Sequence, residues 1–240
     1  MSGDVDIAAA AAVLADQTRV RMLLSLDGDA SRSAGELAKI AGVSASRASF
    51  HLSRLVASGL LVVSSDGRQR RFRLANPEIG ELLERLAAIS PEAKVASLKA
   101  SVHADQVKIG RLCAQHLGGF IGVRLTMTFR ARGFLEEDAE GYQFTDRGFE
   151  VVLPVAPAIE HVAQRSRRVA RHPDWSEKSF HMAGAIAATL TAALLDNEWI
   201  QRVGPDRACK VTPRGHRELR AALGVELHTP RIGNAAVLPS

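Results

Sequence analysis

The chain has 240 residues, of which 46% are hydrophobic and 24% are charged. This balance excludes a disordered or fibrous chain, and the length allows two domains with buried cores. The net charge is +5 and arginines cluster, which favours a polyanionic partner. Two cysteines are too few for a disulfide framework. Asp4 and Asp6 stand where a signal peptide needs positive charge, and no apolar run reaches about 20 residues. We therefore expect a cytoplasmic protein with no membrane partner.

The first 77 residues have the pattern of a winged helix-turn-helix domain. Apolar spacing predicts an amphipathic helix over residues 6–27 and a short helix over residues 34–40. After a break at Gly42, Ser44 can cap a third helix that runs to about Ser58. Two short β-rich segments around an Asp-Gly turn follow, and they predict a hairpin, the wing.

The third helix has a face suited to contact DNA bases. Ala48, Leu52 and Leu55 share one side and are expected to pack on the first two helices. Small polar residues on the other side allow a close approach to the groove floor, and an arginine there can form a bidentate contact with guanine. The predicted DNA-contacting residues of this helix are Ser44, Ser46, Arg47, Ser49, Phe50, Ser53 and Arg54. A solvated helix face is the alternative, but the neighbouring short helix, turn and hairpin favour DNA binding.

The predicted wing holds four arginines within six residues, which are Arg68, Arg70, Arg71 and Arg73. Phe72 and Leu74 alternate with Arg71 and Arg73, so one face is expected to pack on the core and the other to present guanidinium groups. Such an array suits phosphate oxygens or a narrow minor groove, and its contribution falls with salt. A hairpin that only promotes solubility is the alternative.

Two segments of this domain carry a family resemblance. LADQTRVRML, from Leu14, resembles the opening helix of regulators of the arsenical-resistance-repressor (ArsR) family. GVSASRASFHL, from Gly42, resembles that family's recognition helix, although Phe50 stands where the family often has histidine. The resemblance spans roughly residues 8–76 and implies a homodimer on a partly palindromic operator, commonly repressing until an effector binds. Metal-sensing members have a Cys-x-Cys pair before the turn, where this chain has SAGEL, so the resemblance implies no thiolate site there.

The second half of the chain contains an internal repeat. HLGGFI, from His116, is echoed by HMAGAI from His181, and TDRG from Thr145 is echoed by TPRG from Thr212. Each copy is predicted to form a helix, a hairpin and a further helix. The predicted fold is thus mainly α with small β-hairpins (α+β), with an N-terminal winged helix-turn-helix and a C-terminal domain of two wing-like repeats. The predicted domains are 1–77 for DNA binding, 78–100 as a linker and dimerisation helix, 101–224 for effector binding and oligomerisation, and 225–240 as a flexible tail.

The repeated half holds the candidate effector residues. Cys113 and His116 are three residues apart and are expected on one side of a helix. If the copies pack about a pseudo-twofold axis, His116 and His181 occupy equivalent positions and approach each other. His172 and Asp174 add further ligand types, so a soft metal or redox chemistry at the thiol is one interpretation. A histidine in such a segment is more often simply packed or hydrogen-bonded.

An organic ligand pocket between the copies is the more attractive interpretation. Gly118 and its small neighbours leave room between helices, and aromatic side chains can line that space. Close helix packing is again the alternative, because small residues permit it too. The predicted effector-binding residues are Cys113, His116, Tyr142, His172, Trp175 and His181, and the sequence assigns no metal site and no cofactor.

Together these patterns predict a sequence-specific transcriptional regulator, a repressor that an effector in the C-terminal domain releases. Its expected partners are double-stranded DNA, a second copy of the chain and a small effector. There is no phosphate loop, nucleophile elbow or zinc-protease signature, so no catalytic residue is assigned and no enzyme is expected. Two alternatives stay open, which are a non-sensing architectural DNA-binding protein and a ligand-binding or catalytic protein with a vestigial winged helix.

Overall fold

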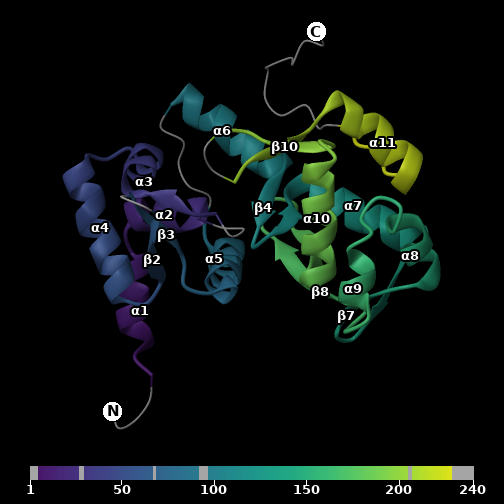
Figure 1. The fold of residues 1–240 in the computed structure, drawn as a ribbon, viewed down its shortest axis with the longest axis horizontal. Helices are drawn as coiled ribbons and strands as arrows, with labels where there is room; N and C mark the ends of the chain where they lie inside the picture. Colours follow the sequence, from purple (N-terminus) through teal and green to yellow (C-terminus); the bar gives the residue numbers. More distant parts are fainter. Residues whose placement is uncertain (1–4, 27–29, 67–68, 92–96, 205–206, 229–240) are drawn as a thin grey trace. The chain divides into compact units, whose positions relative to one another are not determined.

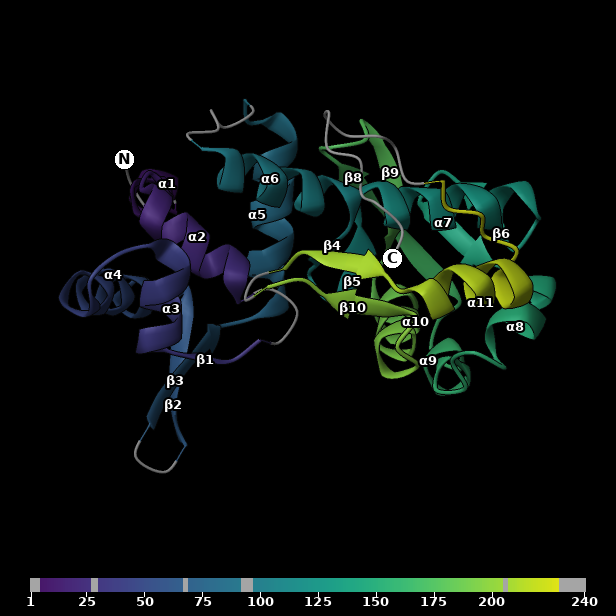
Figure 2. The same ribbon diagram turned by 90° about the horizontal axis from the view of Figure 1, so that it is seen from above.

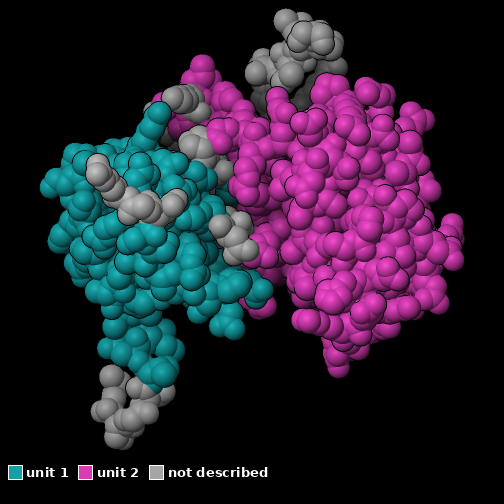
Figure 3. All heavy atoms as spheres, viewed as in Figure 1, with its two compact units in different colours: residues 1–83, 205–207 teal, residues 84–204, 208–240 magenta. Residues whose placement is uncertain are grey.

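The computed structural model describes residues 5–26, 30–66, 69–91, 97–204 and 207–228. The chain forms two compact units, which Figure 3 shows in different colours. The N-terminal unit comprises residues 1–83 with 205–207, and the C-terminal unit comprises residues 84–204 with 208–240. Figure 1 labels the elements along the chain. None of the helices in the described ranges is both long and apolar enough to cross a membrane.

The N-terminal unit is a winged helix-turn-helix, as predicted. Its elements are α1 (Ile7–Leu14), α2 (Gln17–Ser25), β1 (Arg32–Ser33), α3 (Ala34–Ala41), α4 (Ala45–Ala57), β2 (Leu61–Asp66), β3 (Gln69–Leu74) and the first part of α5 (Pro77–Ile89). The three strands form an antiparallel sheet in the order β1-β3-β2. Figure 2 shows the β2–β3 hairpin projecting from the helices of this unit. Leu23, Leu37 and Leu52 lie in its core, where each buried leucine side chain contributes about 1.5–3 kcal/mol.

Local side-chain bonds fix where the helices of this unit begin. Ser44 is extended and its Oγ accepts the N–H of Arg47 at 3.3 Å, so α4 starts at the next residue, as predicted. Ser33 and Glu36 form a capping box at the start of α3. Between these helices Gly42 has a φ of 70°, a conformation that glycine adopts without strain.

The prediction of one helix over residues 6–27 was wrong, because the chain breaks into α1 and α2. Asp16 takes an extended conformation and its carboxylate accepts the N–H of Arg19 at 3.0 Å, which starts a new helix. The guanidinium of Arg19 then donates to the carbonyl oxygens of Ala12 and Val13 at the end of α1. These bonds satisfy backbone groups that a continuous helix would have paired internally.

The C-terminal unit consists of α6 (Leu98–Ile109) and two copies of one motif. The first copy comprises β4 (Arg111–Cys113), β5 (His116–Gly118), α7 (Gly119–Ala131), β6 (Leu135–Asp138), β7 (Gly141–Phe144) and α8 (Asp146–Val152). After α9 (Ile159–Ala163), the second comprises β8 (Arg168–Asp174), β9 (Ser179–Ala183), α10 (Ala185–Asp196), β10 (Ile200–Arg202), β11 (Cys209–Val211) and α11 (Pro213–Leu223). The predicted helix, hairpin and helix are present in each copy, and a further hairpin precedes each of them.

The two copies interlock reciprocally. The second hairpin of the first copy joins the first hairpin of the second copy in one antiparallel sheet, β6-β7-β8-β9. In return, the Cys209 N–H donates to the Gly110 carbonyl oxygen at 2.9 Å, and Arg111 pairs with Ala208. Helix α7 packs on β9 while α10 packs on β5. This exchange of contacts is that of a pseudo-twofold arrangement, which the repeat suggested.

Two predicted boundaries fall near residues outside the described ranges. The helix expected over residues 78–100 ends at Ile89, α6 begins only at Leu98, and residues 92–96 are not described. At the other end, Val225 is buried and its N–H donates to the Leu219 carbonyl oxygen at 2.9 Å. Residues 229–240, most of the expected tail, lie outside the described ranges.

Candidate functional site

The outer face of α4 is open in the N-terminal unit. All seven predicted DNA-contacting residues of this helix are exposed, namely Ser44, Ser46, Arg47, Ser49, Phe50, Ser53 and Arg54. On the opposite side Ala48, Leu52 and Leu55 are buried in the core. The helix therefore has one side fixed by packing and one side available to a partner. Phe50, the one large apolar side chain among these seven residues, is 56% exposed.

Neighbouring bonds hold this face in place. The Ser53 hydroxyl donates to the Phe50 carbonyl oxygen at 2.8 Å, and the Arg54 guanidinium lies 5.9 Å from the centre of the Phe50 ring. On the inner side, His51 is buried with Nδ1 3.8 Å from the Asp16 carboxylate. The centre of α4 thus packs against the start of α2.

The wing presents fewer arginines than the sequence suggested. Arg70 and Arg73 on β3 are exposed. Arg71, predicted to face outward with Arg73, instead donates from Nε to the Ser31 hydroxyl at 3.2 Å and from its guanidinium to the Ser31 carbonyl oxygen. Arg71 thus connects β3 to the segment before β1. Strand β1 itself was not predicted from the sequence. Arg68 lies outside the described residues.

The second candidate site lies where the first hairpins of the two copies meet. Cys113 and His116 are directly opposite each other on β4 and β5, and His172 and His181 are directly opposite each other on β8 and β9. The prediction that Cys113 and His116 share a helix was wrong. The two residues between them have φ values of 46° and 83°, so the chain makes a tight turn there without glycine.

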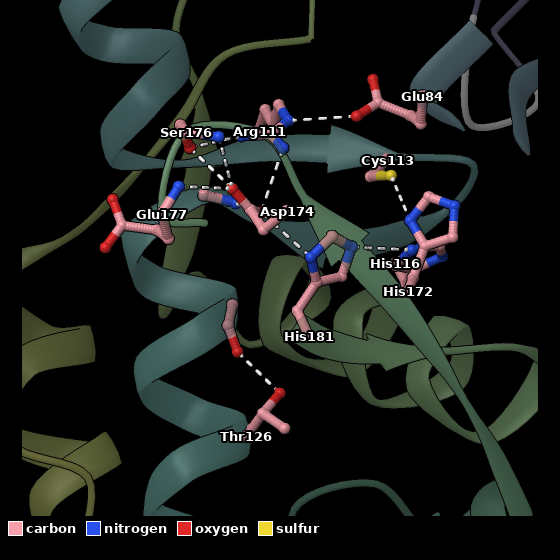
Figure 4. A network of polar contacts seen from close by, with 12 residues as sticks. Glu84, Arg111, Cys113, His116, Thr126, His172, Asp174, Ser176, Glu177 and His181 are labelled. Carbon is pink, nitrogen blue, oxygen red and sulfur yellow. Dashed lines mark hydrogen bonds and ion pairs between the residues drawn. The ribbon is translucent and has the colours of Figure 1, made fainter. Parts of the chain in front are cut away.

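The four side chains converge in a buried cluster, shown in Figure 4. Cys113 Sγ lies 3.5 Å from His172 Nδ1, and His116 Nε2 lies 3.1 Å from His181 Nε2. The three ring centres are 5.0–5.3 Å apart. One ligand atom from each of the four residues lies within 4.8 Å of all the others. All four residues are buried, so the cluster is shielded from bulk water.

Asp174 orients His181 from outside the cluster. Its Oδ2 is 3.0 Å from His181 Nδ1 and accepts the Gly119 N–H at 2.7 Å. Its Oδ1 accepts the N–H and hydroxyl of Ser176 and the N–H of Glu177. Because an ionised carboxylate can only accept, the His181 proton resides on Nδ1 and the lone pair on Nε2 points into the cluster.

A buried arginine anchors this carboxylate. Arg111 donates to Asp174 Oδ2 at 3.0 Å and to the Ser176 hydroxyl at 3.0 Å, and its Nε lies 3.4 Å from Glu84 Oε2. The Arg111, Glu84 and Asp174 side chains are all fully buried. The guanidinium also stacks 4.6 Å from the Trp175 ring. Neither Arg111 nor Glu84 was predicted as a site residue, because no local spacing in the sequence relates the two.

Burial keeps the cluster histidines uncharged. It lowers the pKa of His116 well below 6.5, and the neighbouring His181 and His172 add to the effect. It lowers the pKa of His172 to about 4, with His181 contributing. It also lowers the pKa of His181, although Asp174 opposes this. Burial by itself would raise the pKa of Asp174, but the His181 hydrogen bond and the Arg111 charge hold that pKa far below its ordinary value. Neutral imidazoles beside an ionised carboxylate are the result.

Two predicted effector residues lie elsewhere. Tyr142 packs in the apolar core of the C-terminal unit, with the Arg130 guanidinium 5.6 Å from its ring centre. The Trp175 ring stacks on the Arg111 guanidinium. The small residue Gly118 lies directly against the cluster, since a Cβ there would be 3.2 Å from His181 Cε1.

The chain resembles known regulators over most of its length. A family model described as a helix-turn-helix domain matches residues 14–64. The uncharacterized HTH-type transcriptional regulator YdfF of Bacillus subtilis (strain 168) is 34% identical over 223 residues, which cover 92% of this chain and 99% of that protein. The HTH-type transcriptional regulator CmtR of Mycobacterium tuberculosis (strain ATCC 25618 / H37Rv) is 37% identical over 93 residues, 37% of this chain and 77% of CmtR.

Two further comparisons cover shorter parts of the chain. A probable mercury resistance operon repressor of Streptomyces lividans is 37% identical over 71 residues, 29% of this chain and 55% of that protein. The NMR structure of CmtR, described as a cadmium metal sensor, is 34% identical, covers 38% of this chain and 93% of that chain, and has a TM-score of 0.32. The match to YdfF, in contrast, takes in the repeated half as well as the winged helix-turn-helix. The chain belongs to the ArsR-type winged helix-turn-helix transcriptional regulators, which bind DNA.

Proposed function

We propose that the protein is a cytoplasmic, dimeric repressor that binds a partly palindromic operator and releases it when an effector binds in the C-terminal unit. The observation that supports this most is the outer face of α4. Seven polar, basic or aromatic residues are exposed there, on a helix whose other side is locked in the core. A face of this kind on the second helix of a helix-turn-helix fits the major groove.

In this proposal Arg47 contacts base edges. It lies in the first turn of α4, where the recognition helix of a helix-turn-helix approaches the bases, and its fork matches the two acceptors of guanine. The small neighbours Ser46 and Ser49 allow the helix to approach the groove floor. Arg70 and Arg73 on the wing contact phosphates, which adds affinity without sequence discrimination.

Exposed apolar helices support a second copy of the chain as a partner. Helix α1 consists of alanine, valine, leucine and isoleucine, yet none of its residues is buried. On α5, Leu82, Leu86 and Ile89 are 45%, 37% and 83% exposed and recur at helical spacing along one side. A continuous apolar stripe of this kind is costly in water, and a symmetric dimer would cover it.

An effector site in the C-terminal unit is the remaining element. The cluster of a thiol and three imidazoles is a polar constellation in the interior of this unit, and buried polar groups of this kind need a reason to be there. One related protein is named an operon repressor, which supports repression as the direction of control. No catalytic step is part of this proposal.

Footprinting tests the proposal. We would select bound duplexes from a random library with the full-length protein and map the protected bases at about 150 mM salt. The expected result is two related half-sites about one helical turn apart, and a reporter gene placed behind them should be repressed. Uniform coating of any duplex would instead indicate an architectural protein. Arg214→Ala, which removes an exposed arginine on α11, should bind like the unchanged protein, whereas Arg47→Ala should lose base preference at one position of each half-site.

A further inference from the structure

We propose that Cys113, His116, His172 and His181 bind one divalent transition-metal ion of the zinc type, and that this ion is the effector of the repressor. The inference deepens the proposed function and rests on it for the regulatory part. The sequence assigned no metal site, because its cysteines lack paired spacing. The fold supplies what the spacing lacks, because two hairpins meet and bring Cys113 to His172 and His116 to His181, pairs that are 59 and 65 residues apart in sequence.

The distances between the donors fit a tetrahedral ion. Zinc binds imidazole nitrogen at about 2.0–2.1 Å and thiolate sulfur at about 2.3 Å, so tetrahedral ligand nitrogens are about 3.3 Å apart and nitrogen and sulfur about 3.6 Å apart. The separation of His116 Nε2 and His181 Nε2 is 3.1 Å, and that of Cys113 Sγ and His172 Nδ1 is 3.5 Å. With all four ligand atoms within 4.8 Å of one another, small side-chain movements complete the geometry.

A hydrogen-bonded cluster without an ion satisfies these rings less well. The lone pair of His181 Nε2 points at His116, which has a further hydrogen bond with the Ala114 backbone. The three imidazoles are neutral, and their nitrogens and the thiol sulfur face one another. A metal ion requires ligands of this kind, because a ligand atom must lack a proton or give it up.

The surroundings of the cluster resemble those of a built metal site. A metal-bound histidine usually donates its other N–H to a carboxylate or a carbonyl, which fixes the ring and its tautomer. Asp174 does this for His181, and it is itself held by the Gly119 N–H and by Arg111. Thr126 on α7 accepts the N–H of Met182, the residue after His181, at 2.9 Å, which fixes strand β9 beside the cluster.

A divalent ion would also balance the charge of its own ligand. A thiolate at Cys113 would be buried, and a cation beside it would neutralise that charge, which matters because an uncompensated buried charge is strongly unfavourable.

The donor set selects the class of ion. One thiolate and three imidazoles suit zinc and its borderline neighbours such as Co²⁺, whereas Mg²⁺ and Ca²⁺ prefer oxygen ligands. The site also needs both copies of the repeat, because each first hairpin supplies one cross-strand pair. A bound ion would therefore fix the two copies against each other. In this way the ion would act on the arrangement of the C-terminal unit.

Titration of the full-length, chelator-treated protein with Co²⁺ tests the site. We expect one ion per chain, with the intense visible bands of tetrahedral Co²⁺ and a thiolate-to-metal charge-transfer band, and displacement by Zn²⁺ but not by millimolar Mg²⁺. Cys113→Ser should remove the charge-transfer band, and His181→Gln should weaken binding at least tenfold. The matched controls are Cys209→Ser, the other buried thiol, and His161→Gln, an exposed histidine on α9, which should both behave like the unchanged protein.

The outcomes separate the site from its role. Absence of the charge-transfer band in the unchanged protein, or its loss in Cys209→Ser instead of Cys113→Ser, would overturn the metal site. If His181→Gln does not fold, His116→Gln tests the same ligand pair from the other copy.

The regulatory role is measured as operator affinity with and without Zn²⁺. A tenfold or larger loss that Cys113→Ser abolishes supports it, whereas an ion that binds without changing this affinity overturns the effector assignment. A protein that binds no operator even without metal would instead overturn the proposed function.

Discussion

His116 and His181 occupy the same position in the two copies of the repeat, 65 residues apart in sequence, and their Nε2 atoms lie 3.1 Å apart. The pseudo-twofold axis of the C-terminal unit therefore passes close to this pair. Their cross-strand partners differ, since Cys113 accompanies one histidine and His172 the other. A symmetric scaffold thus has an asymmetric donor set, and within the described part of the chain a carboxylate holds His181 but not His116.

Replacement of Arg47 by alanine should relax base preference. Its side chain is exposed on the first turn of α4, and a bidentate contact with guanine discriminates against other bases by about 1–3 kcal/mol. We expect the variant to lose that preference at one position of each half-site and to bind other positions as before. Competition binding with single-base operator variants measures this. Equal loss at every position would mean that Arg47 contacts only phosphate.

Replacement of Arg73 by glutamine should weaken binding to all sequences and make it less sensitive to salt. An exposed wing arginine on a phosphate releases about one counterion, so the slope of log affinity against log salt should fall by about 1. Affinities measured over a range of salt concentrations give this slope. Arg71→Gln should behave differently, because its bonds to Ser31 hold the sheet together. It should lower the denaturation midpoint and leave the salt slope nearly unchanged.

Replacement of Arg111 by methionine should destabilise the C-terminal unit strongly. The change leaves the Asp174 and Glu84 carboxylates buried without their shared cation, and such a loss costs about 3–5 kcal/mol. Denaturant unfolding followed by the near-ultraviolet signal of Trp175 and Trp199 measures it. Arg130→Met is the matched control, because its ion pair with Glu137 is partly exposed and worth about 0–1 kcal/mol. Similar losses in the two variants would show that the buried triad is not special.

The winged helix-turn-helix could be predicted because its signals are local. The cap at Ser44 and the glycine at position 42 fix α4 from neighbouring residues alone. The break at Asp16 was missed because the apolar period continues through it. The Asp16 carboxylate accepts the Arg19 N–H, and this bond starts a second helix. Periodicity reports which side of a segment is buried and says little about where a side chain caps it.

The cluster was foreseen only in part, for a physical reason. The repeat offset predicted that His116 and His181 would meet, since equivalent residues approach each other near a pseudo-twofold axis. Their strands were mistaken for helices because the turn after Cys113 uses two non-glycine residues with positive φ. Arg111 and Glu84 meet only through tertiary packing, so no spacing in the sequence could relate them.

Replacement of Gly148 or Gly215 by alanine should be equally disruptive in the two copies. In each, the glycine lies against a backbone carbonyl, and a Cβ would be 2.3 Å from the oxygen of Phe134 or 1.8 Å from that of Trp199. Neither backbone can move without shifting its hairpin, so we expect a loss of about 1–3 kcal/mol or more at each site. Thermal unfolding measures both. Gly35→Ala is the control, since nothing lies within 4 Å of its Cβ position, and it should be neutral or slightly stabilising.

Replacement of Leu86 by glutamate should dissociate the dimer. Leu86 lies between Leu82 and Ile89 on the exposed apolar stripe of α5, so in a dimer a carboxylate there would be buried without a cation. Sedimentation of the full-length protein over a range of concentrations measures the monomer–dimer equilibrium. We expect the unchanged protein to be dimeric and the variant to be shifted to monomer by at least tenfold in dissociation constant.

A matched exposed residue makes this test specific. Met127 on α7 is 48% exposed, similar to Leu82 on the stripe, but it lies in the repeated half. Met127→Glu should leave the dimer intact, because a charge on a solvent-exposed surface costs little. Since a repressor on a palindromic operator needs both half-sites filled at once, Leu86→Glu should also lose operator affinity by more than Met127→Glu does. A Leu86→Glu protein that remains dimeric would place the interface elsewhere, and α1, with none of its apolar residues buried, would then be the next surface to alter.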